Sequence, residues 1–274
     1  MTPSPAARTS SLVRKRSGAG EPLLLLHGVG ESAAGWRPTQ NALSESFDVI
    51  VVDLPGFGAA PALPSGISPT SAALADAIEQ QLDELGLTTV HIAGYSLGAR
   101  VGLELASRGR ARSVVAIAPD GLGTPAERVY ETMTLLGRRA FARALSPIAQ
   151  EVTSTGAGRA AFFGSDRSRP WQLTPVDAHD LLLSFANSPA YVRTVLTGSV
   201  DAVRGLSKIS CPVLIVQGMT DALISSQSPR YLAFVPKAQL QLLPNLSHVP
   251  ISDNPRLVTK LIVDFAAPGA AAAA

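Results

Sequence analysis

The sequence predicts an α/β protein whose doubly wound, mostly parallel sheet carries a helical cap inserted between two core strands. Short apolar runs of strand length alternate with segments of helical period along most of the 274 residues, as in parallel sheets covered by helices. Polar or Gly-rich turns follow several of these runs directly, at the strand ends where such sheets bind ligands. Residues 122–206 are the exception, because they contain no run typical of a buried strand.

The composition narrows the class of protein. Hydrophobic residues make up 46% of the chain and charged residues 16%, which suits a large buried sheet. The net charge is +2 and the basic residues are scattered, so we expect a small-molecule substrate and no nucleic acid. The single cysteine, Cys211, excludes an intrachain disulfide and fits the cytoplasm. The apolar runs are too short for membrane insertion, and residues 1–8 lack the apolar core of a signal peptide.

The first third of the chain predicts an edge hairpin followed by alternating helices and strands. The expected elements are a hairpin over residues 11–27, a helix over 36–47, a strand over 48–53 and a helix capped by Ser68. Strands are then expected at 88–93, 113–118, 212–218 and 238–244, with a closing helix at 256–265.

The segment without strands predicts a helical cap above the sheet. Helical pieces at residues 127–145, 177–186 and 189–196 surround a polar, Gly-rich stretch at 153–168. We therefore expect a core formed by residues 10–121 and 207–266, a cap formed by residues 122–206, and a disordered Ala-rich tail at 267–274.

Residues 94–98, Gly-Tyr-Ser-Leu-Gly, are the most informative stretch. A β-branched apolar run precedes them and a helix-like segment follows them. A serine at the tip of such a strand-to-helix turn, with glycine two positions away on either side, is typical of a nucleophile elbow. The turn strains the serine backbone, and glycine is required where neighbouring backbone leaves no room for a Cβ atom.

Three further turns contain the other groups that a nucleophilic serine requires. A buried-strand run ends at Asp221, and the loop after the next strand contains His248. Upstream, a run of four leucines leads into a Gly-rich loop, residues 27–30, whose backbone N–H groups can point at a developing oxyanion.

These segments in this order resemble the α/β-hydrolase superfamily of esterases, lipases and C–C hydrolases. The matching segments extend over about residues 20–265 and are His27-Gly28, residues 53–58, residues 94–98, Gly218-x-x-Asp221 and residues 247–250. The resemblance implies the α/β-hydrolase fold, the chain order Ser-Asp-His of a catalytic triad, and catalysis without a cofactor.

Each candidate catalytic residue has an expected role. Ser96 is the nucleophile, and His248 is the base that a serine hydroxyl needs at neutral pH. Asp221 is the acid that holds the imidazole in the correct tautomer. The backbone N–H groups of Val29 and Leu97 form the expected oxyanion hole, since the first N–H groups of a helix have no partner within it.

Other polar residues are expected to have structural roles. Asp120 is the alternative acid, because some relatives keep their acid after that strand, but we expect it to bond to local backbone. Asp53 belongs to a turn, His27 to the Gly-rich loop and His91 to a strand. No cluster of His, Cys, Asp and Glu has metal-ligand spacing, so we expect no metal.

Arg100 lies one helical turn beyond Ser96 and has two alternative roles. It forms either a structural ion pair or a contact with a substrate carboxylate. The other candidate substrate-binding residues are aromatic: Trp36, Tyr95, Phe162 and Trp171.

We expect a serine hydrolase that cleaves a carboxylic ester or related acyl bond of a small apolar substrate. The loop at residues 27–30 and Trp36 partly resemble C–C hydrolases, although Glu31-Ser32 and Ala99 depart from their pattern. The elbow with Arg100 also resembles a menaquinone-pathway synthase of this fold, which eliminates pyruvate.

A third alternative is a ligand-binding or signalling protein that retains the triad. Epoxide hydrolases and haloalkane dehalogenases of the superfamily use aspartate at the elbow, so the serine argues against both activities.

Overall fold

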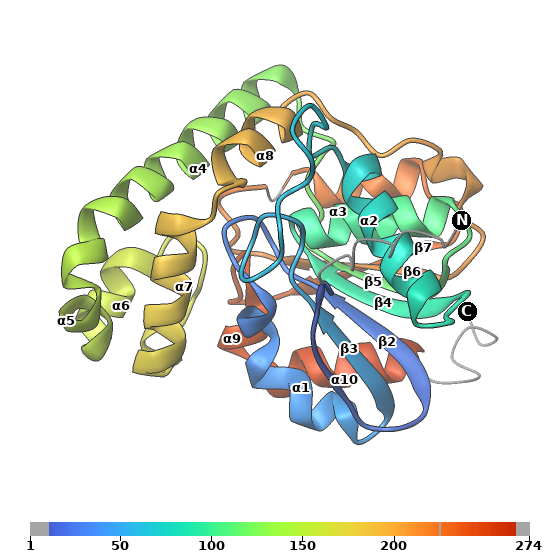
Figure 1. Ribbon diagram of the computed structural model, residues 1–274, viewed down its shortest axis with the longest axis horizontal. Coiled ribbons are helices and arrows are strands. Elements are labelled where there is room, and N and C mark those ends of the chain that lie inside the picture. Colours follow the sequence, from blue (N-terminus) through green and yellow to red (C-terminus); the bar gives the residue numbers. More distant parts are fainter. Residues whose placement is uncertain (1–10, 225, 267–274) are drawn as a thin grey trace, which may run out of the picture.

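A seven-stranded sheet forms the centre of the molecule in the computed structural model, which describes residues 11–224 and 226–266. The strand order is β1-β3-β2-β4-β5-β6-β7, and all neighbours are parallel except β1 and β3 (Figure 1). The strands are β1 (Val13–Ser17), β2 (Glu21–Leu26), β3 (Phe47–Val52), β4 (Val90–Tyr95), β5 (Ala111–Ile117), β6 (Val213–Gly218) and β7 (Ala238–Leu243). The predicted α/β-hydrolase fold is confirmed, whereas the expected tail at 267–274 lies outside the described residues.

Helices cover both faces of the sheet (Figure 1). On one face lie α1 (Arg37–Ser44) and α10 (Pro255–Ala266), and on the other lie α2 (Ser71–Glu84) and α3 (Leu97–Ser107). Apolar side chains alternate along each strand, so each face buries its own cluster. Because β4 is buried along its whole length and paired with both β2 and β5, the residue after it follows a strand that is hydrogen-bonded on both sides.

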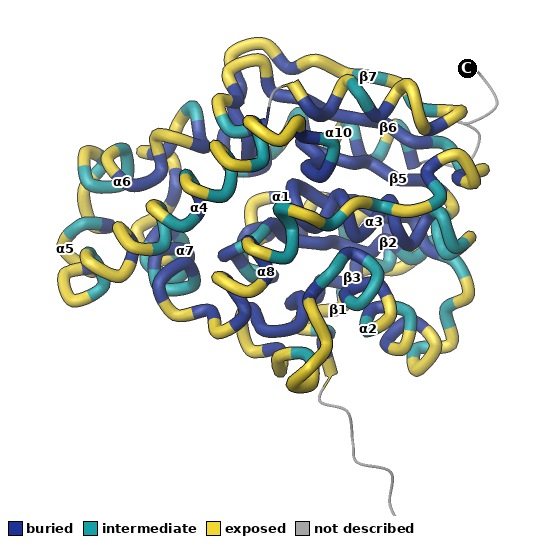
Figure 2. The backbone as a smooth tube through the Cα atoms, turned by 90° about the horizontal axis from the view of Figure 1, so that it is seen from above, coloured by how far each residue is buried: buried dark blue, intermediate teal, exposed yellow. Residues whose placement is uncertain are grey.

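A helical insertion separates β5 from β6. It contains α4 (Pro125–Leu145), α5 (Ala149–Ser154), α6 (Gly156–Phe163), α7 (Pro175–Asn187) and α8 (Tyr191–Gly198). These helices extend beyond the C-terminal ends of the strands (Figure 1), and much of the outer surface of α4, α5 and α6 is exposed while the central strands such as β4 and β6 are buried (Figure 2). In the described residues, no helix combines the length and the apolar character of a membrane span.

Three local predictions were wrong. The predicted hairpin over residues 11–27 does not form, because β3 and β4 flank β2 and leave β1 to pair with β3. Thr70 rather than Ser68 caps α2, since the Thr70 hydroxyl accepts a hydrogen bond from the Ala73 N–H at 3.1 Å. Helix α6 lies inside the stretch at 153–168, where burial of Phe162 and Phe163 outweighs the low helix propensity of two glycines.

Two glycine substitutions test the packing in opposite directions. A Cβ added at Gly137, on the exposed side of α4, would meet no atom within 4 Å. Gly137→Ala should therefore raise the free energy of unfolding by about 0.5–1 kcal/mol, because alanine loses less backbone entropy in a helix.

Gly98→Ala should have the opposite effect. A Cβ at Gly98 would collide with the carbonyl groups of Leu26 and His27, so this substitution should lower the free energy of unfolding. Urea denaturation of both variants measures the two changes, and equal effects would contradict this account.

Candidate active site

Ser96 occupies a strained turn between β4 and α3. Its backbone has φ 53° and ψ −123°, a region that residues with a side chain rarely adopt and that costs about 1–3 kcal/mol. Hydrogen bonds hold the turn on both sides, because the Ser96 N–H donates to the Ile117 carbonyl at 2.9 Å and its carbonyl accepts from the Arg100 N–H at 3.0 Å. The turn projects the Ser96 side chain from the carboxyl end of β4, at the start of α3.

The glycines around Ser96 are required by close backbone contacts. A Cβ at Gly94 would lie 2.5 Å from the Gly98 carbonyl oxygen. At Gly28, an added Cβ would lie 2.9 Å from the Tyr95 ring and 3.3 Å from Ser96 Cβ. Backbone atoms crowd Gly94, whereas side-chain atoms of the elbow crowd Gly28, so residues 27–30 pack directly against the elbow.

His248 and Asp221 form a buried pair at the ends of neighbouring strands. His248 Nδ1 lies 2.9 Å from Asp221 Oδ2, and the other carboxylate oxygen accepts the N–H groups of Leu223 at 2.8 Å and Ile224 at 3.1 Å. Burial acts to raise the pKa of Asp221, but His248 and these hydrogen bonds lower it to about 2. Burial likewise opposes protonation of His248, but the Asp221 carboxylate raises its pKa above the ordinary value. The pair thus stabilises an imidazolium.

Ser96 and His248 line one small cavity, which we call the Ser96 cavity. Val29 and Tyr95 contribute to its wall from the core, and Leu135 of α4 contributes from the helical insertion. Ser96 is 7% and His248 5% exposed, so the insertion closes the cavity from solvent. Val29 also lines a second cavity, to which Leu97 contributes as well, so only Val29 of the two candidate oxyanion residues borders both spaces.

Buried polar contacts fix the Gly-rich loop at residues 27–30 in place. His27 Nδ1 donates to the Gly28 carbonyl at 2.8 Å, while its Nε2 accepts the Leu54 N–H at 2.9 Å. Burial lowers the pKa of His27, which keeps this ring neutral and able to accept. Asp53 accepts the N–H groups of Ala33 at 2.8 Å and Ala59 at 2.9 Å. Both residues therefore have the structural roles expected of them.

A chain of buried charges connects the core to the helical insertion. The Tyr95 hydroxyl donates to Glu31 at 2.6 Å, and Arg167 joins Glu31 at 2.7 Å to Asp166 at 2.7 Å. Arg138 of α4 completes the chain, with Nη1 2.6 Å from Asp166. Burial opposes ionisation of Asp166, but the two arginines lower its pKa and keep it ionised. We call these five residues the buried ion chain; it attaches the insertion to the oxyanion loop.

An open groove lies outside the Ser96 cavity and shares part of its wall. Leu135, Arg138, Asp166 and Leu223 line both spaces. Phe162, packed at 3% exposure, and Trp171, 55% exposed, line this outer groove rather than the Ser96 cavity. The Arg138–Asp166 ion pair therefore forms part of the barrier between the groove and Ser96.

Two aromatic candidates pack against each other. Trp36 is completely buried, packs edge-on against Tyr95 with ring centroids 5.5 Å apart, and is not among the residues that line the Ser96 cavity, whereas Tyr95 is. A direct substrate contact of either residue stays a prediction. Burial and the nearby Glu31 carboxylate raise the pKa of Tyr95, so its hydroxyl stays protonated and bonded to Glu31.

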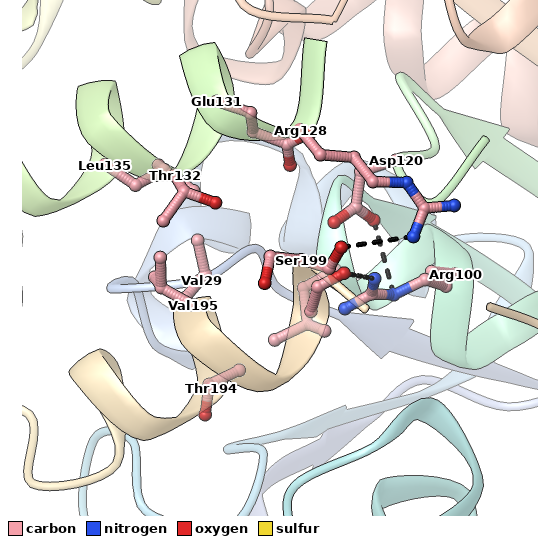
Figure 3. Close-up of a pocket in the computed structure, with 12 residues that line it drawn as sticks. Val29, Arg100, Asp120, Arg128, Glu131, Thr132, Leu135, Thr194, Val195 and Ser199 are labelled. Atoms are coloured by element: carbon pink, nitrogen blue, oxygen red, sulfur yellow. Dashed lines mark hydrogen bonds and ion pairs between the residues drawn. The ribbon is translucent and has the colours of Figure 1, made fainter. Parts of the chain in front are cut away.

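Arg100 faces an acidic group of the protein itself. Its Nε lies 3.5 Å from Asp120 Oδ1, and both side chains are buried in the second cavity (Figure 3). The Asp120 carboxylate thus forms an ion pair with Arg100. The Asp120 backbone carbonyl accepts a hydrogen bond from the Tyr231 hydroxyl at 2.5 Å. Of the two candidate acids, it is Asp221 that contacts His248.

The sequence interpretation missed several buried polar residues beside the site. Asp166 and Arg167 are buried within the stretch at 153–168 that the sequence shows only to be polar and Gly-rich, and the half-buried Glu131 lies on α4. Burial and the neighbouring Asp120 raise the pKa of Glu131 to about 7. Charged residues are normally exposed, so one sequence carries no signal that these are buried. Among the described residues, no group of three His, Cys, Asp or Glu side chains is arranged to hold a metal ion.

The fold and this arrangement define an α/β hydrolase. The model of the alpha/beta hydrolase family matches residues 23–261, and the chain belongs to that family. It is 31% identical over 218 residues to the epoxide hydrolase EphH of Mycobacterium tuberculosis, covering 72% of this chain and 94% of that protein. It is 27% identical over 260 residues to a 2-hydroxy-6-oxononadienedioate/2-hydroxy-6-oxononatrienedioate hydrolase of Pseudomonas putida, covering 89% and 87%.

A solved structure with the same fold is a thermophilic esterase from Thermogutta terrifontis. The two structures superpose with a TM-score of 0.69 at 23% identity, over 90% of each chain. The relatives are hydrolases of different bonds, so the comparisons support a hydrolytic enzyme acting on small molecules.

Removal of Arg167 tests the buried ion chain. Arg167→Met leaves the Glu31 carboxylate without its cation in a buried site, and loss of one partner from a buried ion pair costs about 3–5 kcal/mol. We expect the free energy of unfolding in urea to fall by that amount. Lys260→Met, which breaks the exposed Lys260–Asp264 pair on α10, is the matched control and should leave stability nearly unchanged. Equally small losses in both variants would show that the chain contributes no stability.

Proposed function

We propose that this protein is a serine hydrolase that cleaves a carboxylic ester or related acyl bond through Ser96, His248 and Asp221. The observation that carries the proposal is the strained Ser96 at the wall of a cavity shared with His248, whose Nδ1 is bonded to Asp221. This combination supplies a nucleophile, a base with one free nitrogen, and an acid that orients the base.

Acylation begins when His248 Nε2 takes the proton of Ser96 Oγ. The oxygen then bonds to the substrate carbonyl carbon, and the carbonyl electron pair moves to the oxygen. The N–H groups of Val29 and Leu97 stabilise this oxyanion from the loop and the helix N-terminus. As the carbon–oxygen bond to the leaving group breaks, His248 returns the proton to the leaving oxygen.

Deacylation repeats these steps with water as the nucleophile. His248 takes a proton from water, the hydroxide adds to the acyl carbon, and Ser96 leaves with the proton that His248 returns. The helical insertion acts here as a cap, since its α4 and the loop containing Asp166 close the Ser96 cavity and exclude competing solvent.

The resemblance to an epoxide hydrolase does not extend to the nucleophile. Attack by a carboxylate on an epoxide gives an ester, which water can hydrolyse. Attack by the Ser96 hydroxyl would give an ether, which neither the base nor the oxyanion hole could resolve. A serine at the elbow therefore favours acyl transfer.

C–C bond hydrolysis is the second candidate. It is favoured by the likeness to the Pseudomonas putida hydrolase along nearly the whole chain. Parallel assays of acyl esters, lactones and ring-fission diketones separate the two activities, since the ester hypothesis requires the highest kcat/KM on an ester or lactone. Tight ligand retention with negligible turnover of every compound would favour the ligand-binding alternative instead.

Ser96→Ala tests the nucleophile. We expect hydrolysis of short p-nitrophenyl esters to fall by several orders of magnitude, because the acyl-enzyme cannot form. Labelling by a fluorophosphonate should disappear while the circular dichroism spectrum stays unchanged. Ser154→Ala, at an exposed hydroxyl that ends α5, is the control and should label fully. Undiminished labelling of Ser96→Ala would refute the assignment.

The pH dependence tests the His248–Asp221 pair. His248 must be neutral to accept the serine proton, and its pKa is raised above the ordinary value of 6.5. Activity is therefore lost as pH falls, and the acid limb of kcat/KM should inflect above pH 6.5. Asp221→Asn removes the charge that raises the pKa, so burial should move the inflection to lower pH while kcat falls by about 10⁴-fold. An unmoved inflection in that variant would exclude His248 as the titrating base.

A further inference from the structure

The Ser96 cavity is too small, as it stands, to hold an ester. Its volume is about 20 Å³, which is room for about one water molecule. The second cavity, which Arg100 lines, is no larger. The outer groove has a volume of about 680 Å³ and borders the Ser96 cavity through the residues that line both spaces. Of these three spaces, the outer groove is the one large enough for a substantial part of a substrate.

The outer groove borders the loops that contain the base and the acid. Its lining includes the residue before His248 and the residues on both sides of Asp221, which are Ser247, Thr220 and Ala222. Neither candidate oxyanion residue belongs to that lining. When Ser96 attacks an ester, the carbonyl oxygen faces the oxyanion residues, and the leaving oxygen faces His248, which protonates it. The leaving alcohol is therefore the part of the substrate that extends toward the groove.

Aromatic side chains determine which ligand the groove suits. They come from α4, α6 and the segment after α6, and they are Tyr130, Phe141, Phe162 and Trp171. All but Phe162 are exposed, so contact with an apolar ligand would remove aromatic surface from water. The charged groups of the lining are already paired with one another, since Arg138 and Arg167 both contact Asp166. The groove thus has no unpaired charge for an ionic ligand among the described residues.

We propose that the outer groove is the leaving-group subsite and that it accepts esters of bulky, uncharged aromatic alcohols. This inference rests on the proposed function. It makes the aromatic side chains of the helical insertion determinants of alcohol specificity, while the acyl group has no place in the groove.

Arg138 is the charged part of the shared wall that can move without leaving a carboxylate unpaired. Its Nη1 contacts Asp166 at 2.6 Å, and among the described residues its buried Nε and Nη2 have no hydrogen-bond partner. Arg167 Nη1 lies 2.7 Å from the same Asp166 oxygen and keeps that carboxylate paired. Displacement of Arg138 breaks one ion pair and its stacking on Phe185, whose ring centroid is 4.2 Å from the guanidinium carbon. The groove then joins the space beside Ser96.

Two isomeric esters test which side of the scissile bond uses the groove. The naphthyl group is on the alcohol in 2-naphthylmethyl acetate and on the acid in methyl 2-naphthylacetate, and methyl acetate is the reference without it. Each kcat/KM is divided by the rate constant for hydrolysis of that ester by hydroxide. We expect 2-naphthylmethyl acetate to exceed methyl acetate by about 10-fold or more, because an apolar pocket discriminates by at least this factor. Methyl 2-naphthylacetate should gain less, and the anionic 6-carboxy-2-naphthylmethyl acetate should be poorer than its uncharged parent.

Filling the groove tests where the naphthyl group binds. Ala161 lines the groove from α6, so Ala161→Trp should lower the ratio of kcat/KM between 2-naphthylmethyl acetate and methyl acetate by about 10-fold. Ala140→Trp, at an exposed alanine of α4 outside the groove lining, is the matched control and should keep the wild-type ratio. The wild-type series decides the question even if Ala161→Trp does not fold.

Each remaining outcome has a separate meaning. Equal corrected kcat/KM for the three uncharged esters overturns the subsite and leaves the serine hydrolase intact. A larger gain from methyl 2-naphthylacetate overturns it in favour of an acyl group in the groove, and preference for the carboxylate overturns its neutral character. Fluorophosphonate labelling at Ser96 without hydrolysis of any of these esters also overturns the subsite alone. Absence of both labelling and hydrolysis overturns the proposed function itself, and the subsite with it.

Discussion

The backbone around Ser96 cannot relax, because three segments meet there without space for another carbon atom. The end of β2, the end of β4 and the first turn of α3 approach so closely that Gly94 and Gly98 have no room for a Cβ. In this crowded turn Ser96 adopts a positive φ, which is strained for a residue with a side chain. The hydrogen bond from the Ser96 N–H to the Ile117 carbonyl holds this conformation. The same contact brings residues 27–30 against the Ser96 turn. Tight packing thus fixes the position of the Ser96 side chain relative to that loop.

The buried ion chain extends this constraint to the helical insertion. Glu31 lies just after the oxyanion loop, Arg167 and Asp166 lie between α6 and α7, and Arg138 lies on α4. The Asp166 backbone carbonyl also accepts the Val249 N–H at 2.9 Å, next to His248. The ion chain therefore links the insertion both to the loop before Glu31 and to the segment that contains His248. The Arg138–Asp166 pair also lies in the wall that the outer groove shares with the Ser96 cavity.

The sequence by itself determined the strand-to-helix turn at Ser96, the family, and the strand ends that carry Asp221 and His248. These features depend on local pattern: an apolar run fixes a strand, glycines fix a tight turn, and the carboxyl ends of parallel strands share one edge. Only the tertiary structure decided that β1 pairs with β3, that Trp36 is core, and that Glu31 meets Arg167. Those outcomes depend on contacts between residues far apart in the chain. Packing of the whole domain decides which residues meet, and no local sequence pattern indicates the partner.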